Sequence, residues 1–89
     1  MLFYVYVLES LKDGKRYIGF TNNLRRRFEE HQKGQSFSTK YRLPFKLIYF
    51  EACTNRDDAV RREEYFKSTG GNRFLAKRLK VYYKVKSKL

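Results

Sequence analysis

The chain begins with hydrophobic segments whose pattern predicts β-strands. Residues 2–9 are rich in β-branched and aromatic side chains and are apolar at both alternating positions, which is typical of a central strand covered on both faces. Residues 12–15 contain Asp-Gly and predict a turn, and residues 16–20 follow as the partner strand of a hairpin. Residues 45–53 are again apolar on both faces. We therefore expect three strands, the first two joined as a hairpin.

A helical pattern begins where the second strand ends. Residues 22–34 open with short polar side chains that can cap a helix, and apolar positions then recur at helical spacing. At about 100° per residue, Leu24, Phe28 and His31 fall on one narrow stripe, with Arg27 beside it. We expect this stripe to face the sheet, so that an arginine and a histidine border an apolar surface.

Two further helices are predicted after the third strand. Thr54 and Asp57 have the spacing of a capping box at the start of a helix over residues 56–68. The Gly-Gly pair after that helix predicts its end, and the last helix spans residues 72–83. A basic tail, residues 84–89, follows and is expected to fray.

The element order β-β-α-β-α-α predicts an α+β fold. We expect a small three-stranded antiparallel or mixed sheet flanked by helices, in one domain that covers residues 1–83. At 89 residues, such a chain buries roughly 60–65% of its unfolded surface, which is enough for one modest core.

The composition narrows the possible metal chemistry. The chain has one cysteine, Cys53, and one histidine. An internal disulfide and a cysteine-based zinc site are therefore excluded. A metal site would have to use oxygen ligands, which favours Mg²⁺ or Mn²⁺ over zinc.

The net charge of +12 is large for so small a chain and favours a polyanion as partner. The alternative is a basic coat that only keeps the protein soluble. The apolar residues 2–8 are too few to span a bilayer and lack the features of a signal peptide. We therefore expect no membrane partner and a cytoplasmic location.

One carboxylate stands out in the helix predicted over residues 56–68. Glu63 falls inside the apolar arc that Ala59 and Phe66 define. A carboxylate on a packing face is unfavourable unless it has a partner or a function. Glu63 is thus either a candidate site residue or the ion-pair partner of a nearby arginine, Arg27 or Arg62.

These residues together resemble the GIY-YIG nuclease superfamily. The resemblance rests on Tyr4-Val5-Tyr6, on Tyr17-Ile18-Gly19, and on Arg27, His31 and Glu63 at the spacings of the family motif. It spans nearly the whole chain and is greatest to small standalone members, which are similar to the N-terminal domain of the excision-repair nuclease subunit. The first half of the motif departs from the family, because tyrosine and valine stand where glycine and isoleucine are usual.

The resemblance implies divalent-metal-dependent hydrolysis of phosphodiester bonds, with one Mg²⁺ or Mn²⁺ per site. Glu63 would hold the metal, and Arg27 would bind the phosphate oxygens. Tyr17 would be the general base for the attacking water or a relay to one. Tyr6 would position the water or hydrogen-bond Tyr17. His31 would accept a proton or orient a tyrosine, unless it is a structural histidine on the inner face of the helix.

The expected substrate is DNA, cut with low sequence specificity or with a preference for nicked or branched structures, as in DNA repair. RNA remains a second possible substrate, and the protein could be a monomer or a homodimer. The alternative function is a catalytically silent nucleic-acid-binding module with the same fold. Candidate phosphate contacts, which a solvated basic face would explain equally well, are Arg25, Arg26, Lys40 and Arg42.

Overall fold

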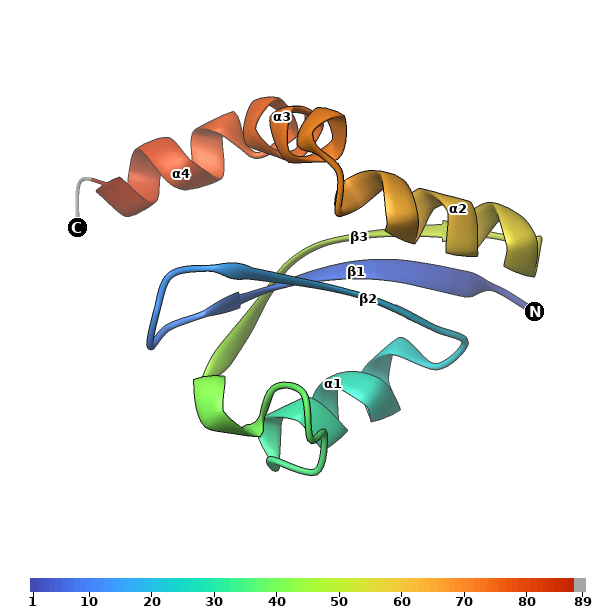
Figure 1. Ribbon diagram of the computed structural model, residues 1–89, viewed down its shortest axis with the longest axis horizontal. Helices are drawn as coiled ribbons and strands as arrows, with labels where there is room; N and C mark the ends of the chain where they lie inside the picture. The colour runs from blue at the N-terminus through green and yellow to red at the C-terminus, as the bar shows by residue number, and fades with distance from the viewer. Residues whose placement is uncertain (88–89) are drawn as a thin grey trace.

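The computed structural model, which describes residues 1–87, contains a three-stranded sheet between two helical layers (Figure 1). The elements, in chain order, are β1 (Phe3–Ser10), β2 (Arg16–Thr21), α1 (Leu24–Gln32), a 3₁₀ turn (Lys40–Arg42), β3 (Phe45–Cys53), α2 (Arg56–Phe66), α3 (Thr69–Arg78) and α4 (Lys80–Ser87). The sheet order is β2-β1-β3, and both strand pairs are antiparallel. The predicted α+β class is confirmed, and the sheet is antiparallel rather than mixed.

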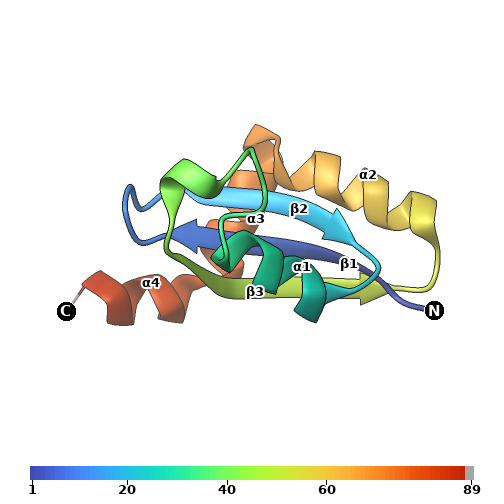
Figure 2. The same ribbon diagram turned by 90° about the horizontal axis from the view of Figure 1, so that it is seen from below.

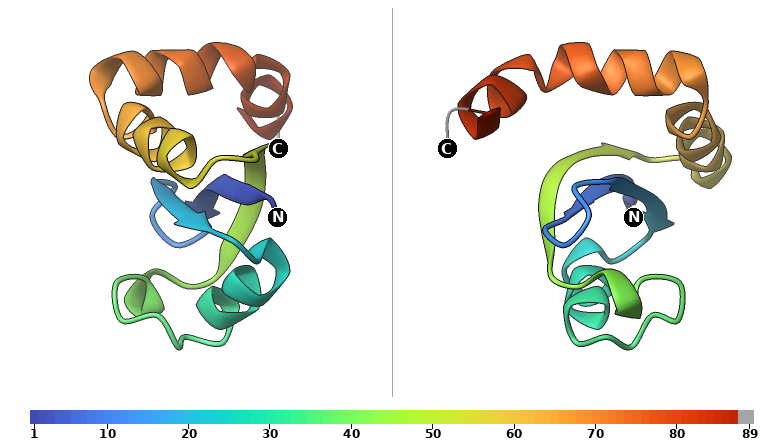
Figure 3. Two further views of the ribbon diagram at one scale, coloured as in Figure 1. Left: turned by 90° about the vertical axis from the view of Figure 1, so that its right-hand side faces the viewer. Right: turned by 60° about the vertical axis from the view of Figure 1, so that its left-hand side comes forward.

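The central strand β1 supplies two hydrophobic cores because its side chains alternate between the faces of the sheet. Val5 and Val7 pack into the core beneath α2 and α3. Tyr6 and Leu8 pack into a second core on the face that α1 covers. Figure 2 shows α1 on its face of the sheet, and Figure 3 shows α2, α3 and α4 on the opposite side. The two-faced pattern of the first strand is thus explained.

The hairpin register brings the two halves of the tyrosine motif together. Tyr6 lies opposite Gly19, and Leu8 lies opposite Tyr17. A Cβ atom at Gly19 would overlap the Tyr6 ring, with Cε1 of that ring only 2.8 Å away. The ring of Tyr6 therefore crosses the backbone of β2 at the one position where no side chain obstructs it.

The first helix is as predicted in its orientation, although it is shorter than 22–34. Asn23 caps α1 by accepting a hydrogen bond from the Arg26 backbone N–H at 3.1 Å. Leu24 and Phe28 pack against the second core, and His31 is fully buried. The apolar stripe therefore faces the sheet.

Three details of the later helices differ from expectation. The cap of α2 is Asn55, whose side chain accepts from two backbone N–H groups, rather than the neighbouring Thr54. The N-cap of α3 is Ser68, so the helix begins at Thr69 and includes the Gly-Gly pair that was expected to precede it. The predicted helix 72–83 is wrong as a single element, since Leu79 leaves helical geometry at ψ 25° and separates α3 from α4.

The last helix extends closer to the C-terminus than the sequence predicted, to Ser87 rather than residue 83. Lys86 pairs with the carboxylate of Glu9 at 2.8 Å, and the Tyr82 hydroxyl donates to the same group at 2.7 Å. Because Glu9 is almost completely buried in β1, these contacts fix α4 to the sheet. Residues 84–87 of the expected tail belong to α4, and residues 88–89 lie outside the described residues. Within residues 1–87, no helix has the length and apolar character needed to cross a bilayer.

Candidate active site

Tyr6 lies at the centre of the candidate site. Its side chain is almost fully buried, and its hydroxyl lies 2.9 Å from Nε2 of His31. Burial raises the pKa of Tyr6 to about 12, although the nearby Arg27 guanidinium opposes this shift. Tyr6 is therefore protonated at neutral pH, and its hydroxyl is held by His31 rather than by Tyr17.

His31 is a neutral connector between two hydroxyl groups. Its Nδ1 lies 2.7 Å from Oγ1 of Thr39, so both ring nitrogens are hydrogen-bonded. Burial, and secondarily the positive charge of Arg27, lowers the pKa of His31 to about 4. The ring is therefore uncharged at neutral pH and is placed to orient Tyr6, one of the roles considered for it above.

This histidine makes the stability of the fold depend on pH. In the unfolded chain His31 takes up a proton below its ordinary pKa of about 6.5, whereas in the folded chain it stays neutral down to about pH 4. Acid therefore favours the unfolded state, and the stabilisation present above pH 6.5 is lost as the pH falls towards 4. We expect this effect to be about 2–3 kcal/mol.

The measurement is urea unfolding of the wild type and of His31→Gln at pH 7 and near pH 4. Other groups also titrate in acid, so the informative quantity is the difference between the two proteins. The wild type is expected to be the more stable at pH 7, and its advantage is expected to shrink in acid. A difference that stays constant with pH would contradict the buried, neutral histidine.

Tyr17 and Arg27 adjoin this pair from β2 and α1. The half-buried Tyr17 ring meets His31 edge-on, with ring centroids 5.2 Å apart, and its hydroxyl lies 3.4 Å from Oγ of Ser38. Arg27 donates to Glu30 at 3.1 Å and to Ser36 at 3.3 Å. These contacts occupy two of the five guanidinium N–H groups, so the others can still donate to a bound anion.

Glu63 approaches from the opposite helical layer. Its side chain is 21% exposed, and its only ion pair within residues 1–87 is with Lys67 at 3.4 Å. The expected alternative partners are taken, because Arg27 pairs with Glu30, and Arg62 pairs with a different carboxylate at 2.9 Å. The negative charge of Glu63 makes a minor contribution to the raised pKa of Tyr6. Within residues 1–87, the Glu63 side chain makes no hydrogen bond or ion pair with Tyr6, Tyr17, Arg27 or His31.

Residues 36–39, which we call the hydroxyl loop, were not identified as site residues from the sequence. Ser36 contacts Arg27, Ser38 contacts Tyr17, and Thr39 contacts His31. Ser36 and Thr39 are buried although they lie in a polar segment between α1 and β3. The dense run of serine and threonine after a helix that carries two candidate site residues was the available signal.

The four candidate phosphate contacts have different surroundings. Arg25 and Arg26 are exposed on α1, and the Lys40 ammonium lies within 4.9 Å of two exposed aromatic rings. Arg42 instead holds the hairpin turn, because its guanidinium bonds Asp13 at 3.0 Å and the Lys15 carbonyl at 3.1 Å. That bond lowers the pKa of Asp13 to about 2. Arg42 is therefore already engaged within the fold.

The donor set near Tyr6 suits a hard cation with few protein ligands. Among the described residues, no three His, Cys, Asp or Glu side chains are grouped to hold a metal ion. Glu63 is a single, partly exposed carboxylate, and Mg²⁺ is commonly bound through one or two carboxylates together with waters and substrate phosphates. The residues present thus fit Mg²⁺ or Mn²⁺ and do not fit a zinc centre.

The chain is similar in sequence to one described protein family and to several small bacterial proteins. Residues 2–78 match the family described as the GIY-YIG catalytic domain. A UPF0213 protein of Limosilactobacillus reuteri is 46% identical over 68 residues, which cover 73% of this chain and 70% of the relative. A UPF0213 protein of Streptococcus pneumoniae is 43% identical over 65 residues, which cover 72% of this chain and 65% of the relative, slightly less than two thirds of its length.

A solved structure extends the similarity to three dimensions. The solution NMR structure of a UPF0213 protein from Bacillus halodurans superposes with a TM-score of 0.55 at 35% identity, covering 86% of this chain and 84% of that one. The sequence match to the family spans most of the residues, including every tyrosine, arginine, histidine and glutamate of the candidate site. The chain therefore belongs to the GIY-YIG family and is related to the small proteins named UPF0213.

Proposed function

We propose that this protein is a divalent-metal-dependent endonuclease that hydrolyses phosphodiester bonds in DNA. The observation that supports the proposal is the contact of Tyr6 and Tyr17 with His31, beside the positive charge of Arg27. Hydrolysis of a phosphodiester requires an activated water and compensation of the negative charge that develops on the phosphate. The family relationship and the net charge of +12 support a nucleic acid as the substrate.

The residues divide between proton transfer and phosphate binding. Tyr6 is a poor candidate for the general base, because burial raises its pKa to about 12 and its hydroxyl therefore stays protonated. Tyr17 is half-buried beside Ser38 and is the better candidate to accept the proton of the attacking water. In this proposal Nε2–H of His31 donates to the Tyr6 oxygen at 2.9 Å, which leaves the single Tyr6 proton to be donated to a water or phosphate oxygen.

Arg27 binds the phosphate in this proposal. Its planar fork can donate two parallel hydrogen bonds to phosphate oxygens, a geometry that lysine cannot reproduce. The contacts to Glu30 and Ser36 restrict the rotamer of Arg27 before substrate arrives. Glu63 would hold Mg²⁺ or Mn²⁺, which when bound supplies positive charge at the phosphate and at the leaving oxygen.

The test is a panel of labelled duplex, nicked, branched and single-stranded DNA, together with RNA, incubated with Mg²⁺, with Mn²⁺ or with EDTA. We expect a nicked or cleaved DNA product only with a divalent ion. Tyr17→Phe keeps the ring and removes the hydroxyl, so we expect about a hundredfold loss of cutting rate. Tyr41→Phe removes a hydroxyl from a 71% exposed tyrosine on the neighbouring segment and is expected to cut normally.

The outcome that would contradict the proposal is binding without cleavage. A protein that binds DNA with a steep salt dependence but yields no product with any divalent ion would be the catalytically silent binding module instead. Equal cutting by Tyr17→Phe and Tyr41→Phe would remove Tyr17 from the mechanism.

A further inference from the structure

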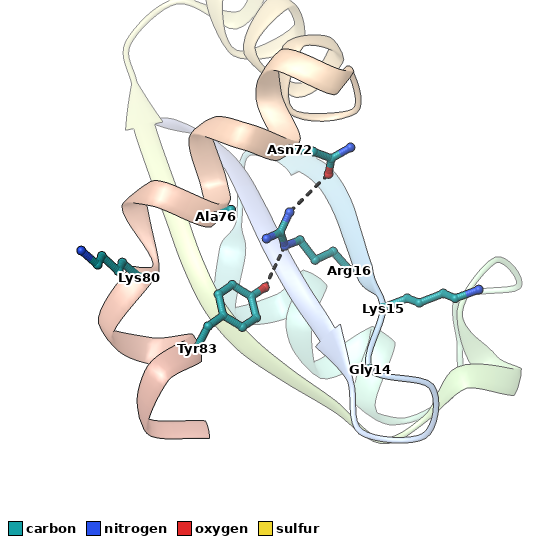
Figure 4. Close-up of a pocket in the computed structure, with 7 residues that line it drawn as sticks. All are labelled: Gly14, Lys15, Arg16, Asn72, Ala76, Lys80 and Tyr83. Carbon is teal, nitrogen blue, oxygen red and sulfur yellow. Dashed lines mark hydrogen bonds between the residues drawn. The ribbon is translucent and has the colours of Figure 1, made fainter. Parts of the chain in front are cut away.

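A pocket outside the candidate active site lies on the other side of the β1–β2 hairpin from α1. An open pocket of about 670 Å³ separates the hairpin turn from the last two helices (Figure 4). No acidic residue contributes to its wall, which is formed chiefly by Lys15 and Arg16 from the hairpin, Asn72 and Ala76 from α3, and Lys80 and Tyr83 from α4.

Arg16 is oriented in this pocket by two neutral oxygen atoms. Its Nε donates to the Tyr83 hydroxyl at 2.8 Å, and its Nη1 donates to Oδ1 of Asn72 at 3.2 Å. The guanidinium also lies 5.2 Å from the centre of the Tyr83 ring. Two of the five N–H groups are thereby used to fix the side chain, and the others can still donate to a ligand.

The positive charge of the pocket is not compensated within the described part of the chain. Within residues 1–87, neither Arg16 nor the two lysines has a carboxylate within ion-pair distance. Arg16 is partly buried between its strand and the last two helices without an acidic partner, which is unfavourable for folding alone. An oriented, uncompensated guanidinium is a suitable site for phosphate.

The arrangement of the cations favours an extended anion over a compact one. Figure 4 shows Lys80 and Lys15 extending to opposite sides of Arg16, while Asn72 and Tyr83 point towards it. A single phosphate ion would be surrounded best by converging cations. Cations that diverge along an open pocket instead match successive charges on a nucleic-acid backbone.

The position of the pocket connects it to the candidate active site. Arg16 immediately precedes Tyr17 in the edge strand β2, and Gly19 follows three residues later, roughly 10 Å along the strand. The helix that carries Asn72 directly follows the helix that carries Glu63. A nucleic-acid strand that follows the β2 edge can therefore reach both places.

We propose that this pocket binds backbone phosphates of the same nucleic-acid strand that is cut at the candidate active site. The proposal rests on the nuclease function proposed above, and it assigns the hairpin–α3–α4 pocket as an extension of the substrate groove. Arg16 is the central phosphate ligand, and Lys15 and Lys80 contact the flanking phosphates. Asn72 and Tyr83 are positioning residues that hold the Arg16 fork.

The test measures binding in EDTA, where no cutting can occur. Fluorescence anisotropy with labelled duplex and single-stranded DNA is recorded over a range of NaCl concentrations for the wild type, Lys80→Gln and Lys77→Gln. Lys77 is an exposed lysine on α3 that does not line the pocket, so it is a matched control for loss of one charge. Arg16→Gln is a second variant, whose folding is checked by circular dichroism.

We expect Lys80→Gln to lower the magnitude of the slope of log K against log salt by about 0.7–0.9, which corresponds to one lost phosphate contact. Lys77→Gln is expected to leave the slope unchanged, and folded Arg16→Gln to weaken binding further than Lys80→Gln. Equal slopes for Lys80→Gln and Lys77→Gln would overturn the proposal. Inorganic phosphate and a mononucleotide are also tested as competitors of the labelled DNA. If either displaces it as effectively, per phosphate, as unlabelled DNA does, the proposal is overturned, because the pocket would then bind a compact anion.

Failure of this inference differs from failure of the nuclease function. If the wild type cuts DNA but the Lys80→Gln slope is unchanged, the pocket proposal is wrong and the nuclease proposal stands. If the slope changes as expected but no divalent ion yields product, the pocket binds a strand and the nuclease proposal is wrong.

Discussion

Under the proposed function, Glu63→Gln is expected to cut DNA at least about a thousandfold more slowly than the wild type, because it removes the partly exposed carboxylate that we propose holds the divalent cation. A metal ion that stabilises developing charge supplies several kcal/mol to the barrier, and about 4 kcal/mol corresponds to three orders of magnitude. Glutamine keeps the size of the side chain and a neutral oxygen. The expected loss is therefore one of metal affinity and charge rather than of packing.

The neighbouring residue provides the control for this substitution. Glu64→Gln makes the same change of charge one position along α2, where the side chain is exposed, and is expected to cut at close to the wild-type rate. Urea unfolding of both variants checks the fold, since the Glu63–Lys67 pair is a surface i,i+4 contact worth only about 0.3–0.5 kcal/mol. Wild-type cutting by Glu63→Gln would show that this carboxylate does not hold the metal.

Gly19→Ala is expected to destabilise the fold by about 3–5 kcal/mol and to abolish cutting at the same time. The new methyl group would overlap the Tyr6 ring, which has no free space to move into because Tyr6 is almost fully buried. Overpacking of this kind costs about 1–3 kcal/mol. Displacement of the ring would also leave the buried Tyr6–His31 hydrogen bond unmade, at a similar further cost.

Gly70→Ala is the matched control, because it adds the same methyl group at a glycine with space around it. Its nearest atom outside the local backbone would be a Tyr65 ring carbon at 3.5 Å. In the first turns of α3 alanine is favoured over glycine, so we expect unchanged or slightly increased stability. Denaturant midpoints and cutting rates of the two variants are compared. A Gly19→Ala protein with a wild-type midpoint would mean that the Tyr6 ring does not occupy this position.

The sequence could predict which side chains lie on each face of the sheet and of α1, because the periodicity of a strand or helix depends on its local geometry. Alternation along β1 placed Tyr6 and Val7 on opposite faces, and helical spacing placed His31 on the inner face of α1. The same periodicity put Glu63 on the packing side of its helix, where the structure leaves its side chain only 21% exposed; its role in metal binding stays a prediction. In each case one element, considered alone, contained the required information.

Features that depend on contacts between distant segments could not be predicted in this way. The break at Leu79 coincides with α4 turning to reach the buried Glu9 through Tyr82 and Lys86. Arg42 looked like a free surface cation, yet it is bonded to a turn 29 residues away. The choice of Asn55 over Thr54 as helix cap is a difference of one position between two suitable residues, which sequence spacing does not resolve.

The hydroxyl loop links the positions of three candidate site residues to one short segment of the chain. Ser36, Ser38 and Thr39 are nearly consecutive, and each restrains a different residue: the guanidinium of Arg27, the phenol of Tyr17 and the imidazole of His31. Detachment of this short segment would release all three restraints in one event. Under the proposed function, displacement of this segment is expected to weaken proton transfer and phosphate binding together.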